Sequence, residues 1–538
     1  MYEIVIVGGG PVGLALAADL GHRGRSCLLL EQGNGVVAHP KLTLVNVRSM
    51  EFCRRWGIVD EMRKVGFARD FPRDIVYTTG LNGHEITRFH YPTYNQREPH
   101  PDYVEHNQYC SQMWFEPILL RLARSFDGVE LRHHTRLDSL QQDGDGVTLG
   151  LTNLRTGGRQ QVRAGLVVGC DGAGSTTRKL LGINFEGNTA ASKSINIIFR
   201  CPDLWRYHAM GKAAHTWTIR PDGPPRVLIS VNGSDLWRLM VGFEGNEDLV
   251  QQNPAEFVYQ MLGIRFPLEV VSVLNWLRHR RIASSYRSGR VFLAGDAAHA
   301  LPPTGGYGMN LGLGDIMDLS WKLDAQLAGW GGEDLLSSYQ QERRPEGQRI
   351  INEATSNMAL ISQIPRFRDI LEDGVDGVRG RGELGDFIQK HNRKQYASEG
   401  VQLGVCYANS PIIVGEAGPP PTQAPDHYRP TTYPGCRAPH AWLAPGRSML
   451  DLFGTGMQLC YMGDHPGESA PLQEAASRRK LPLGFNHITD PQIRKCYQRR
   501  WVLVRPDGHV AWRGDKPPRD PEALLDKVRG TGSQAHHS

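Results

Sequence analysis

The stretch that decides the fold is Ile4-Val5-Ile6-Val7-Gly8-Gly9-Gly10-Pro11-Val12-Gly13, which continues through residues 14–21 into Cys27-Leu28-Leu29-Leu30-Glu31. The order is an apolar run, a glycine turn, apolar and small residues at helical spacing, and a second apolar run. This order predicts a strand, a tight turn, a helix and a strand. It begins a Rossmann-like βαβ unit, so the predicted fold class is α/β.

The spacing Gly8-x-Gly10-x-x-Gly13 predicts a dinucleotide site at this turn. Gly8 allows the sharp turn, Gly10 leaves room for a pyrophosphate at the backbone, and Gly13 lets helix and strand pack closely. The helix N-terminus directs free N–H groups and partial positive charge at the phosphates. Glu31 is placed to accept hydrogen bonds from a ribose diol. A glycine turn in another kind of βαβ unit would leave Glu31 without a role.

Length, composition and charge limit the classes of protein to which the chain can belong. The chain has 538 residues, enough for about three domains. Its 40% hydrophobic and 22% charged residues are typical of soluble globular proteins. A net charge of +5 is too small to indicate nucleic-acid binding, and no apolar run approaches the ~20 residues of a membrane span. The N-terminus lacks the basic segment of a signal peptide, so we expect a cytoplasmic protein.

The nine cysteines are scattered, and none forms a Cys-x-x-Cys pair. Their spacing indicates neither a zinc site nor a dithiol redox centre, so no metal is expected. An odd, unpatterned set of cysteines fits a reducing cytoplasm. We interpret each as a small buried hydrophobic residue.

A substrate-binding sheet domain is expected from residues 189–285, together with part of residues 70–110. Strand-like runs there alternate with little helix: Ser194 to Phe199, His215 to Arg220, Arg226 to Val231, and Trp237 to Phe243. They predict an antiparallel sheet with one exposed face. Because cofactor motifs lie on both sides of it, this domain is predicted to be inserted into a nucleotide-binding domain of residues 1–188 and 286–360.

The rest of the chain divides into three predicted parts. Residues 361–415 form a helical connecting region with a glycine-rich, charged and exposed stretch at 374–385. Residues 416–432 are a proline-rich linker. Residues 433–538 alternate strands and helices again, which predicts a small separate α/β domain.

Two further motifs indicate that the dinucleotide is FAD. The first is Val168-Gly169-Cys170-Asp171-Gly172-Ala173-Gly174-Ser175-Thr176-Thr177-Arg178, in which an apolar strand ends in Asp-Gly before a helix start. The second is Val291-Phe292-Leu293-Ala294-Gly295-Asp296-Ala297-Ala298-His299, followed by Pro302-Pro303-Thr304-Gly305-Gly306-Tyr307-Gly308-Met309-Asn310. Asp296 can accept from a sugar or ribityl hydroxyl. Gly308, Met309 and Asn310 open a helix whose N–H groups can face the flavin edge where negative charge gathers on reduction.

Together, the three motifs resemble the class A FAD-dependent aromatic hydroxylases, the para-hydroxybenzoate hydroxylase and phenol hydroxylase family. The resemblance covers about residues 2–360. It implies a Rossmann-like FAD-binding domain of the GR2 type with an inserted antiparallel-sheet domain. It associates Asp171 with both FAD and NAD(P)H, places Asp296 on the flavin ribityl and pyrophosphate, and places Gln112 on the FAD. It also implies that the carbonyl of Pro303 borders the substrate hydroxyl.

One departure from the family concerns Lys41. The family has Pro-Arg-Ala where this chain has Pro40-Lys41-Leu42. Lysine keeps the charge expected on a cofactor phosphate but loses the bidentate fork of arginine.

The C-terminal segment resembles the thioredoxin-like extension of the phenol hydroxylases, on residues 434–440 and 504–513. Without Cys-x-x-Cys this extension is predicted to serve packing or dimerisation. The resemblance implies a homodimer.

The substrate is expected between the inserted sheet and the flavin. The polar and aromatic candidates on the sheet are His215, Trp217, Arg220, Arg226 and Arg238. Alternation along the strand puts His215 and Trp217 on one face and Arg220 on the other, so only one set can face the flavin. Each also has a structural interpretation, because sheet arginines are usually solvated and a tryptophan usually joins the core. Tyr109 and His106 are candidates for deprotonating a phenol.

The resemblance implies a reaction and its partners. NAD(P)H reduces the flavin, dioxygen adds at C4a, and the hydroperoxide transfers one oxygen atom to an electron-rich ring. The expected substrate is a phenolic aromatic. No second glycine motif occurs, which fits a nicotinamide that binds and leaves.

Three alternatives stay open. The same fold can serve epoxidation, Baeyer–Villiger oxidation or inactivating hydroxylation of a polycyclic natural product or antibiotic. A flavin-bound protein that binds a ligand without turnover is a second alternative, which substrate-stimulated NAD(P)H oxidation would exclude. An NAD-dependent dehydrogenase is disfavoured because the Asp171-Gly172 and Gly295-Asp296 motifs would have no role there.

Overall fold

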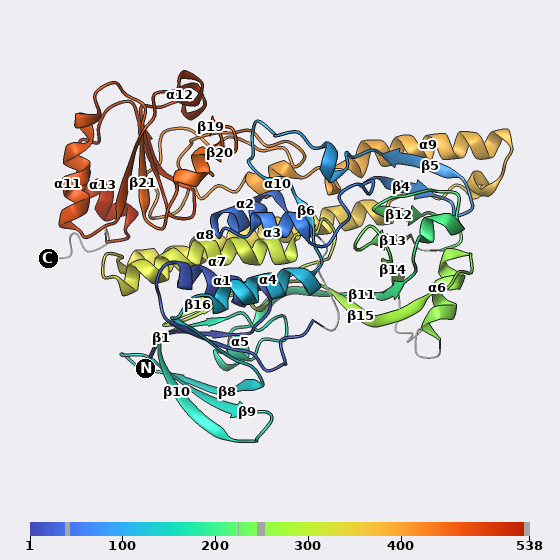
Figure 1. The fold of residues 1–538 in the computed structure, drawn as a ribbon, viewed down its shortest axis with the longest axis horizontal. Coiled ribbons are helices and arrows are strands. Elements are labelled where there is room, and N and C mark those ends of the chain that lie inside the picture. Colours follow the sequence, from blue (N-terminus) through green and yellow to red (C-terminus); the bar gives the residue numbers. More distant parts are fainter. Residues whose placement is uncertain (38–43, 224, 245–252, 532–538) are drawn as a thin grey trace.

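The computed structural model describes residues 1–37, 44–223, 225–244 and 253–531, and Figure 1 shows their arrangement. The N-terminal sheet has the strand order β16-β17-β10-β1-β2-β7, with β9 paired to β10 and β8 to β9. Its strands are β1 (Tyr2–Val7), β2 (Cys27–Leu30), β7 (Val129–Arg132), β8 (Thr135–Gln142), β9 (Val147–Asn153), β10 (Arg159–Gly169), β16 (Arg287–Ser288) and β17 (Val291–Leu293). The fold is α/β, and β1 runs parallel to both β2 and β10.

The parallel strands bring the three motifs to one edge of this sheet. Val7 pairs with Gly169, and Gly169 pairs with Leu293. Each of these residues ends its strand, so the loops that carry Gly8, Asp171 and Asp296 leave the sheet side by side. Ligands of open α/β sheets bind at such carboxyl ends.

Helices cover the N-terminal sheet. They are α1 (Pro11–His22), α2 (Val47–Arg55), α3 (Val59–Lys64), α4 (Gln112–Arg124), α5 (Thr176–Leu180), α7 (Gly308–Leu327) and α8 (Glu333–Ser362). α1 packs against α4 and α7, and α7 packs against α8. Figure 1 shows the long helices α7 and α8 running through the middle of the molecule. One buried core joins this layer, with Leu16 of α1, Phe115 of α4 and Leu313 of α7.

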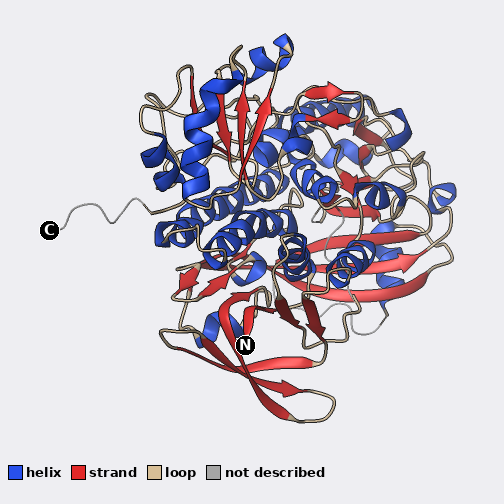
Figure 2. Cartoon of the chain, turned by 60° about the vertical axis from the view of Figure 1, so that its left-hand side comes forward, coloured by secondary structure: helices blue, strands red, loops and turns tan. Residues whose placement is uncertain are grey.

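The second sheet has the order β18-β15-β11-β14-β13-β12-β4-β5. Its strands are β4 (Ile75–Thr78), β5 (Glu85–Phe89), β11 (Phe185–Arg200), β12 (His215–Thr218), β13 (Arg226–Ser230), β14 (Leu236–Glu244), β15 (Glu269–Ala283) and β18 (His299–Ala300). The pairing is antiparallel except between β12 and β4, which is parallel. Figure 2 shows its long strands to the right of the N-terminal sheet.

Helices pack on both faces of the second sheet, although one face was expected to be exposed. α6 (Pro254–Leu262) packs Phe257 and Val258 against Ile197 and Phe199 of β11. The opposite face packs against α9 (Val375–His391). α9 contains the glycine-rich stretch expected to be exposed, and residues 374–376, 378–379 and 382–383 are exposed, whereas Gly377, Gly380 and Gly385 are buried. The glycines allow close packing, because a Cβ on Gly385 would lie 3.0 Å from the Ile86 carbonyl oxygen.

The C-terminal sheet has the order β22-β21-β23-β24. Its elements are β21 (Met457–Tyr461), β22 (Leu483–His487), β23 (Trp501–Val504), β24 (Val510–Gly514), α11 (Ala470–Arg478), α12 (Pro491–Tyr497) and α13 (Pro521–Val528). The remaining short elements are β3 (Leu44–Val45), β6 (Gln108–Tyr109), α10 (Glu399–Leu403), β19 (Trp442–Ala444) and β20 (Arg447–Ser448). The thioredoxin-like character of this part stays a prediction.

The C-terminal domain is docked on the helical layer rather than standing apart. Arg505, which follows β23, has no solvent exposure and reaches Glu342 of α8 at 2.6 Å and Asp318 of α7 at 3.0 Å. Arg437 forms a buried ion pair with Glu51 of α2. These buried pairs join the two parts into one body.

Candidate active site

The glycine turn has the geometry that a pyrophosphate site needs. Gly8 has φ +107°, and a Cβ there would lie 2.4 Å from the Cys170 carbonyl oxygen. A Cβ on Gly13 would lie 2.0 Å from the Gly8 carbonyl oxygen. In contrast, a Cβ on Gly10 would meet nothing within 4 Å. Gly8 and Gly13 are therefore needed by the protein's own packing, whereas Gly10 faces open space where a cofactor fits.

Glu31 is held at the end of β2 by two backbone N–H groups. Gly9 N donates to Oε2 at 2.7 Å, and Gly33 N donates to Oε1 at 2.6 Å. A carboxylate has about four lone-pair sites, so both oxygens can still accept from a ribose diol. The two backbone bonds orient the group for that role.

Asp171 stabilises the loop that follows β10. Its carboxylate accepts from Ser175 Oγ at 2.5 Å, Thr177 N at 2.9 Å and Thr177 Oγ1 at 3.1 Å. Ser175 in turn caps α5 by accepting from Arg178 N. Asp171 therefore holds the loop in place at the sheet edge beside the glycine turn.

Asp296 and Asp315 show how the third motif is built. His299 Nε2 lies 2.6 Å from Asp315 Oδ2, to which Gly295 N also donates at 3.0 Å. Arg343 Nε donates to the other Asp315 oxygen at 2.8 Å. Burial alone would raise the pKa of Asp315, but His299 and Arg343 outweigh it and lower that pKa. His299 thus helps to hold the loop of the third motif.

Asp296 itself is exposed, whereas residues 291–295 and 297–302 are buried. Its carboxylate forms no hydrogen bond within the described residues. A buried ion cluster therefore holds the loop, and the loop presents one free carboxylate to a ligand.

The N-terminus of α7 has backbone N–H groups that can donate hydrogen bonds to a ligand. Its first helical hydrogen bond runs from Leu311 N to Tyr307 O, so the N–H groups of Gly308, Met309 and Asn310 have no helical acceptor. The Asn310 side chain is committed elsewhere: Nδ2 donates to Leu44 O, and Oδ1 accepts from Asn46 N at 2.9 Å. Backbone groups, rather than the asparagine amide, are left for the flavin.

The remaining expected cofactor residues lie as follows. Gln112 opens α4, where its Nε2 donates to Glu116 Oε1. Lys41 lies outside the described residues. The glycine turn, the exposed carboxylate and the two helix N-termini fit FAD, since they match its pyrophosphate, ribityl and flavin groups.

Pro303 is exposed in the loop before α7, and its carbonyl oxygen accepts from Gly306 N at 3.2 Å. The expected role of this carbonyl at the substrate stays a prediction.

The rings of Tyr109 in β6 and His215 in β12 lie close together. Their ring centroids lie 5.8 Å apart. Burial raises the pKa of Tyr109 and lowers the pKa of His215 to about 4. His215 Nδ1 is buried and has no hydrogen-bond partner in the described chain. This face of the sheet also carries Ile198, which packs against Met113 and Trp114 beside Gln112.

Other residues proposed for substrate binding or catalysis contact groups other than Tyr109 and His215. Trp217 lies in the core, where it stacks on Tyr77 at 6.1 Å and donates from Nε1 to the Tyr396 hydroxyl. Arg220 pairs with Asp222 in the following turn. His106 Nε2 lies 2.8 Å from the Glu98 carbonyl oxygen, to which it can only donate.

The sequence did not single out Arg73. Its side chain is buried at 5% exposure, with Nε and Nη1 unpartnered within the described residues. Its guanidinium lies over the rings of Tyr94 at 4.8 Å and Tyr109 at 5.8 Å. Arg73 precedes β4 in a segment without a motif, so no spacing signal identifies it.

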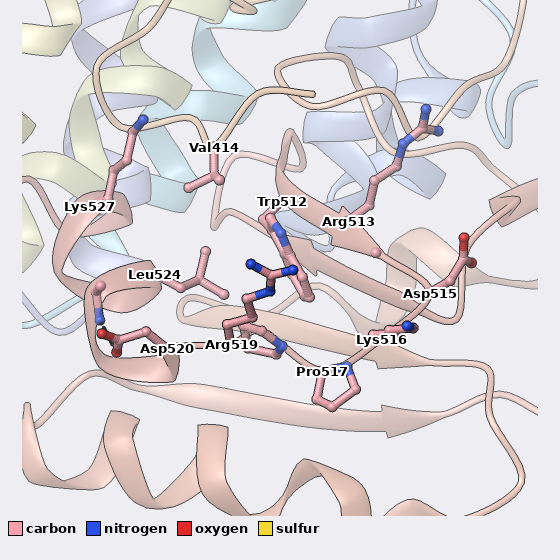
Figure 3. A pocket seen from close by; sticks show the side chains of 13 residues that line it. Val414, Trp512, Arg513, Asp515, Lys516, Pro517, Arg519, Asp520, Leu524 and Lys527 are labelled. Carbon is pink, nitrogen blue, oxygen red and sulfur yellow. Dashed lines mark hydrogen bonds between the residues drawn. The ribbon is translucent and has the colours of Figure 1, made fainter. Parts of the chain in front are cut away.

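The cavity shown in Figure 3 lies elsewhere, in the C-terminal domain. It has a volume of about 870 Å³ and is lined by Val414 and by residues between Trp512 and Lys527. None of the flavin motif residues lines it.

Two negative findings concern the described ranges. No helix there is long and apolar enough to cross a membrane. No group of three or more His, Cys, Asp or Glu side chains is arranged there to hold a metal ion.

Comparisons with known proteins define the class. A family model described as "FAD binding domain" matches residues 1–354, and one described as "Aromatic-ring hydroxylase, C-terminal" matches residues 431–531. The chain therefore belongs to the class A FAD-dependent aromatic hydroxylase family. It is a flavin-dependent monooxygenase of that family.

Particular relatives span the full chain. The FAD-dependent monooxygenase apdD of Emericella nidulans is 31% identical, covering 99% of this chain and 91% of that protein. The tetracenomycin B2 monooxygenase-dioxygenase of Streptomyces olivaceus is also 31% identical, covering 98% of this chain and 97% of that protein. The structure of RebC soaked with chromopyrrolic acid, with bound 7-carboxy-K252c, superposes with a TM-score of 0.91. It is 38% identical, covering 98% of this chain and 99% of that one.

Proposed function

We propose that this monooxygenase hydroxylates a polycyclic phenolic compound that carries an acidic group, with NAD(P)H as reductant and dioxygen as oxygen donor. The observation that carries the proposal is the environment of Arg73. Its guanidinium is buried, has unpartnered donors and lies over the rings of Tyr94 and Tyr109. Buried N–H donors of a cation that have no hydrogen-bond acceptor are unfavourable. A substrate carboxylate would accept from them, and a large aromatic ring system would cover the tyrosines.

Arg238 and His215 support the same substrate. Arg238 is buried on the sheet face that carries His215, and burial lowers its pKa to about 10, so it stays a cation at pH 7. Charge-assisted hydrogen bonds between arginine and a carboxylate are among the strongest in proteins. His215 is neutral at pH 7, because burial lowers its pKa, and its Nδ1 can accept a hydrogen bond from a phenolic hydroxyl.

The other residues position the reactants. Bound FAD supplies electron transfer from NAD(P)H and the activation of dioxygen. Gly10, Glu31, Asp296 and the start of α7 would hold it. The Tyr109 hydroxyl stays protonated, since burial raises its pKa, and can donate to an oxygen of the substrate. The buried face of the sheet excludes water from that region.

Relatives are consistent with an acidic substrate. One relative is named for tetracenomycin B2, and the solved structure of RebC holds 7-carboxy-K252c, which bears a carboxyl group by name. A simple phenol is the second candidate, favoured by the hydroxylase family itself.

The test is NAD(P)H consumption by the purified yellow holoenzyme with three substrate sets. These are polycyclic phenolic acids, their methyl esters, and simple phenols, with products followed by mass. We expect a gain of one oxygen atom with near one-to-one NAD(P)H use for the acids, and weaker turnover of the esters.

Equal turnover of acids and esters would contradict the acidic group. Preferential turnover of simple phenols would favour the second candidate. No stimulation by any aromatic would favour ligand binding without turnover.

A further inference from the structure

Two cysteines that lie far apart in sequence meet beside the C-terminal domain. Cys406 Sγ and Cys436 Sγ are 2.7 Å apart although thirty residues separate them. Cys406 follows α10, and Cys436 opens the C-terminal domain. A cysteine pair with this separation forms no local motif, so the sequence offers no sign of it.

The backbone holds the two cysteines together. They form an antiparallel bridge, next to which Tyr407 N donates to Gly435 O at 2.9 Å. Gly435 has φ +93°, and a Cβ there would lie 2.5 Å from Ala408 N. Only glycine allows this approach. Cys436 is further held because its carbonyl oxygen accepts from Val510 N of β24.

Cys406 differs chemically from the other eight cysteines, all of which lie in the described chain. The pKa of each of those eight is raised, with burial a cause throughout; examples are Cys53 and Cys460. The pKa of Cys406 is lowered, first by the hydrogen bond from Cys436 and then by the Ala408 N–H, against the effect of burial. Cys406 is partly exposed, whereas Cys436 is buried. A partly exposed thiolate beside a resolving thiol is the arrangement of reactive cysteines.

We propose that Cys406 and Cys436 form a reversible disulfide when the protein meets a peroxide. The Cys406 thiolate attacks one oxygen of hydrogen peroxide, so that an S–O bond forms, the O–O bond breaks and the leaving hydroxide takes a proton to become water. The Cys436 sulfur then attacks the Cys406 sulfur, an S–S bond forms, the S–O bond breaks and a second water leaves. The two thiols lose two electrons and two protons, and the peroxide gains both electrons.

The bond would link the C-terminal domain to a segment that supports the flavin site. Gln402, four residues before Cys406, accepts from Val47 N at the start of α2. The Tyr407 hydroxyl accepts from Arg343, which also binds Asp315 under the third flavin motif. A disulfide would close the proline-rich segment into a loop and restrict the unfolded chain.

The experiment uses the full-length holoenzyme, reduced, freed of reductant and treated with hydrogen peroxide. Remaining thiols are alkylated under denaturing conditions, and peptides are mapped by mass without reduction. We expect two of the nine thiols to be lost, a linked pair of peptides carrying Cys406 and Cys436, an upward shift of the thermal midpoint, and reversal by dithiothreitol. No aromatic substrate or NAD(P)H is involved, so the result is independent of the proposed function.

Two variants sharpen the test. Cys406→Ser should leave Cys436 open to alkylation after peroxide, whereas Cys496→Ser, which removes another partly exposed cysteine of the C-terminal domain, should keep the linked peptides. Alkylation of Cys406 and Cys436 as complete as that of Cys496 would overturn the proposal. A link to another cysteine or to a second chain would do the same. If Cys406→Ser fails to fold, the wild-type peptide map decides alone.

Discussion

Arg505 and Arg73 are both buried arginines, yet their surroundings are opposite. Arg505 contacts three carboxylates, those of Glu342, Asp318 and Asp507, at 2.5–3.0 Å. Arg73 contacts the faces of two tyrosines, and its Nε and Nη1 have no partner within the described residues. The protein's own carboxylates neutralise Arg505, whereas two donors of Arg73 stay available to a ligand.

The same contrast separates Asp315 from Asp296. Asp315 is buried and bound by His299, Arg343 and Gly295 N, whereas Asp296 is exposed in the same motif. Removing one member of a completed buried set leaves an uncompensated charge and destabilises the fold. Removing a charged group that has no partner in the protein should weaken only the binding of the ligand that pairs with it. Charges that the protein itself neutralises therefore stabilise the fold, and charges without a partner in the protein indicate the ligand-binding site.

The largest effect is expected from Arg505→Met. Loss of this cation leaves Glu342, Asp318 and Asp507 close together and buried, which should lower the free energy of unfolding by about 3–5 kcal/mol. Denaturant unfolding followed by tryptophan fluorescence measures it. Arg379→Ala, which breaks an exposed pair with Asp376, is the control and should cost at most about 1 kcal/mol. Equal effects of the two variants would contradict a structural role for the buried cluster.

The next effect is the loss of flavin from Asp296→Ala. Losing one charged acceptor costs about 1.5–3 kcal/mol of binding, or roughly 10- to 150-fold in FAD affinity, so the variant should purify largely colourless. Its apoprotein should unfold like the wild-type apoprotein, because the carboxylate is exposed. Absorbance near the flavin bands, with FAD titration, measures the change. Full flavin occupancy would show that Asp296 does not hold the cofactor.

A smaller, substrate-specific effect is expected from Arg73→Gln. With a phenolic acid as substrate, KM should rise about tenfold or more, as the loss of a charged hydrogen bond implies, while FAD binding and stability hold. Steady-state kinetics with the acid and with its methyl ester test this prediction, because only the KM for the acid should rise.

Arg226→Gln is the matched control for Arg73→Gln. Arg226 is partly buried, and its Nη1 contacts Met261 of α6 on the far face of the sheet. Identical kinetics of the two variants would argue against an anion site at Arg73.

The last effect concerns pH. The pKa of His215 is lowered to about 4 by burial, below its ordinary value near 6.5 in the unfolded chain. The unfolded state therefore binds more protons between these values, and His215 makes stability fall as pH drops from about 6.5 to about 4. His215→Gln should flatten this part of the curve of unfolding midpoint against pH. An unchanged slope would mean that His215 titrates normally.

The substrate side was the part that the sequence described least well. Alternation along β12 placed His215 and Trp217 on one face, and both do face the same side. Only the structure separates them: Trp217 stacks on Tyr77 and His215 meets Tyr109, while both lie beside Tyr396. The partners of these rings come from residues 77, 109 and 396, and strand periodicity contains no information on such distant contacts.

By itself the sequence predicted the cofactor side. The roles of the glycines at 8, 10 and 13, Glu31, Asp171 and Asp296 were predicted from local spacing, because a strand, a turn and a helix start are made by consecutive residues. The family and the α/β fold followed from the order of these motifs.

The tertiary structure alone decided which charges are neutralised and which are left open. Arg505 and Arg73 are the same residue type in stretches without a shared motif. Arg505 binds Glu342 and Asp318, which lie 163 and 187 residues away, whereas Arg73 lies over two tyrosine rings and keeps unpartnered donors. The pairing of Cys406 with Cys436 is of the same kind. Contacts between distant segments are set by packing of the whole chain, and packing is a property that local spacing does not encode.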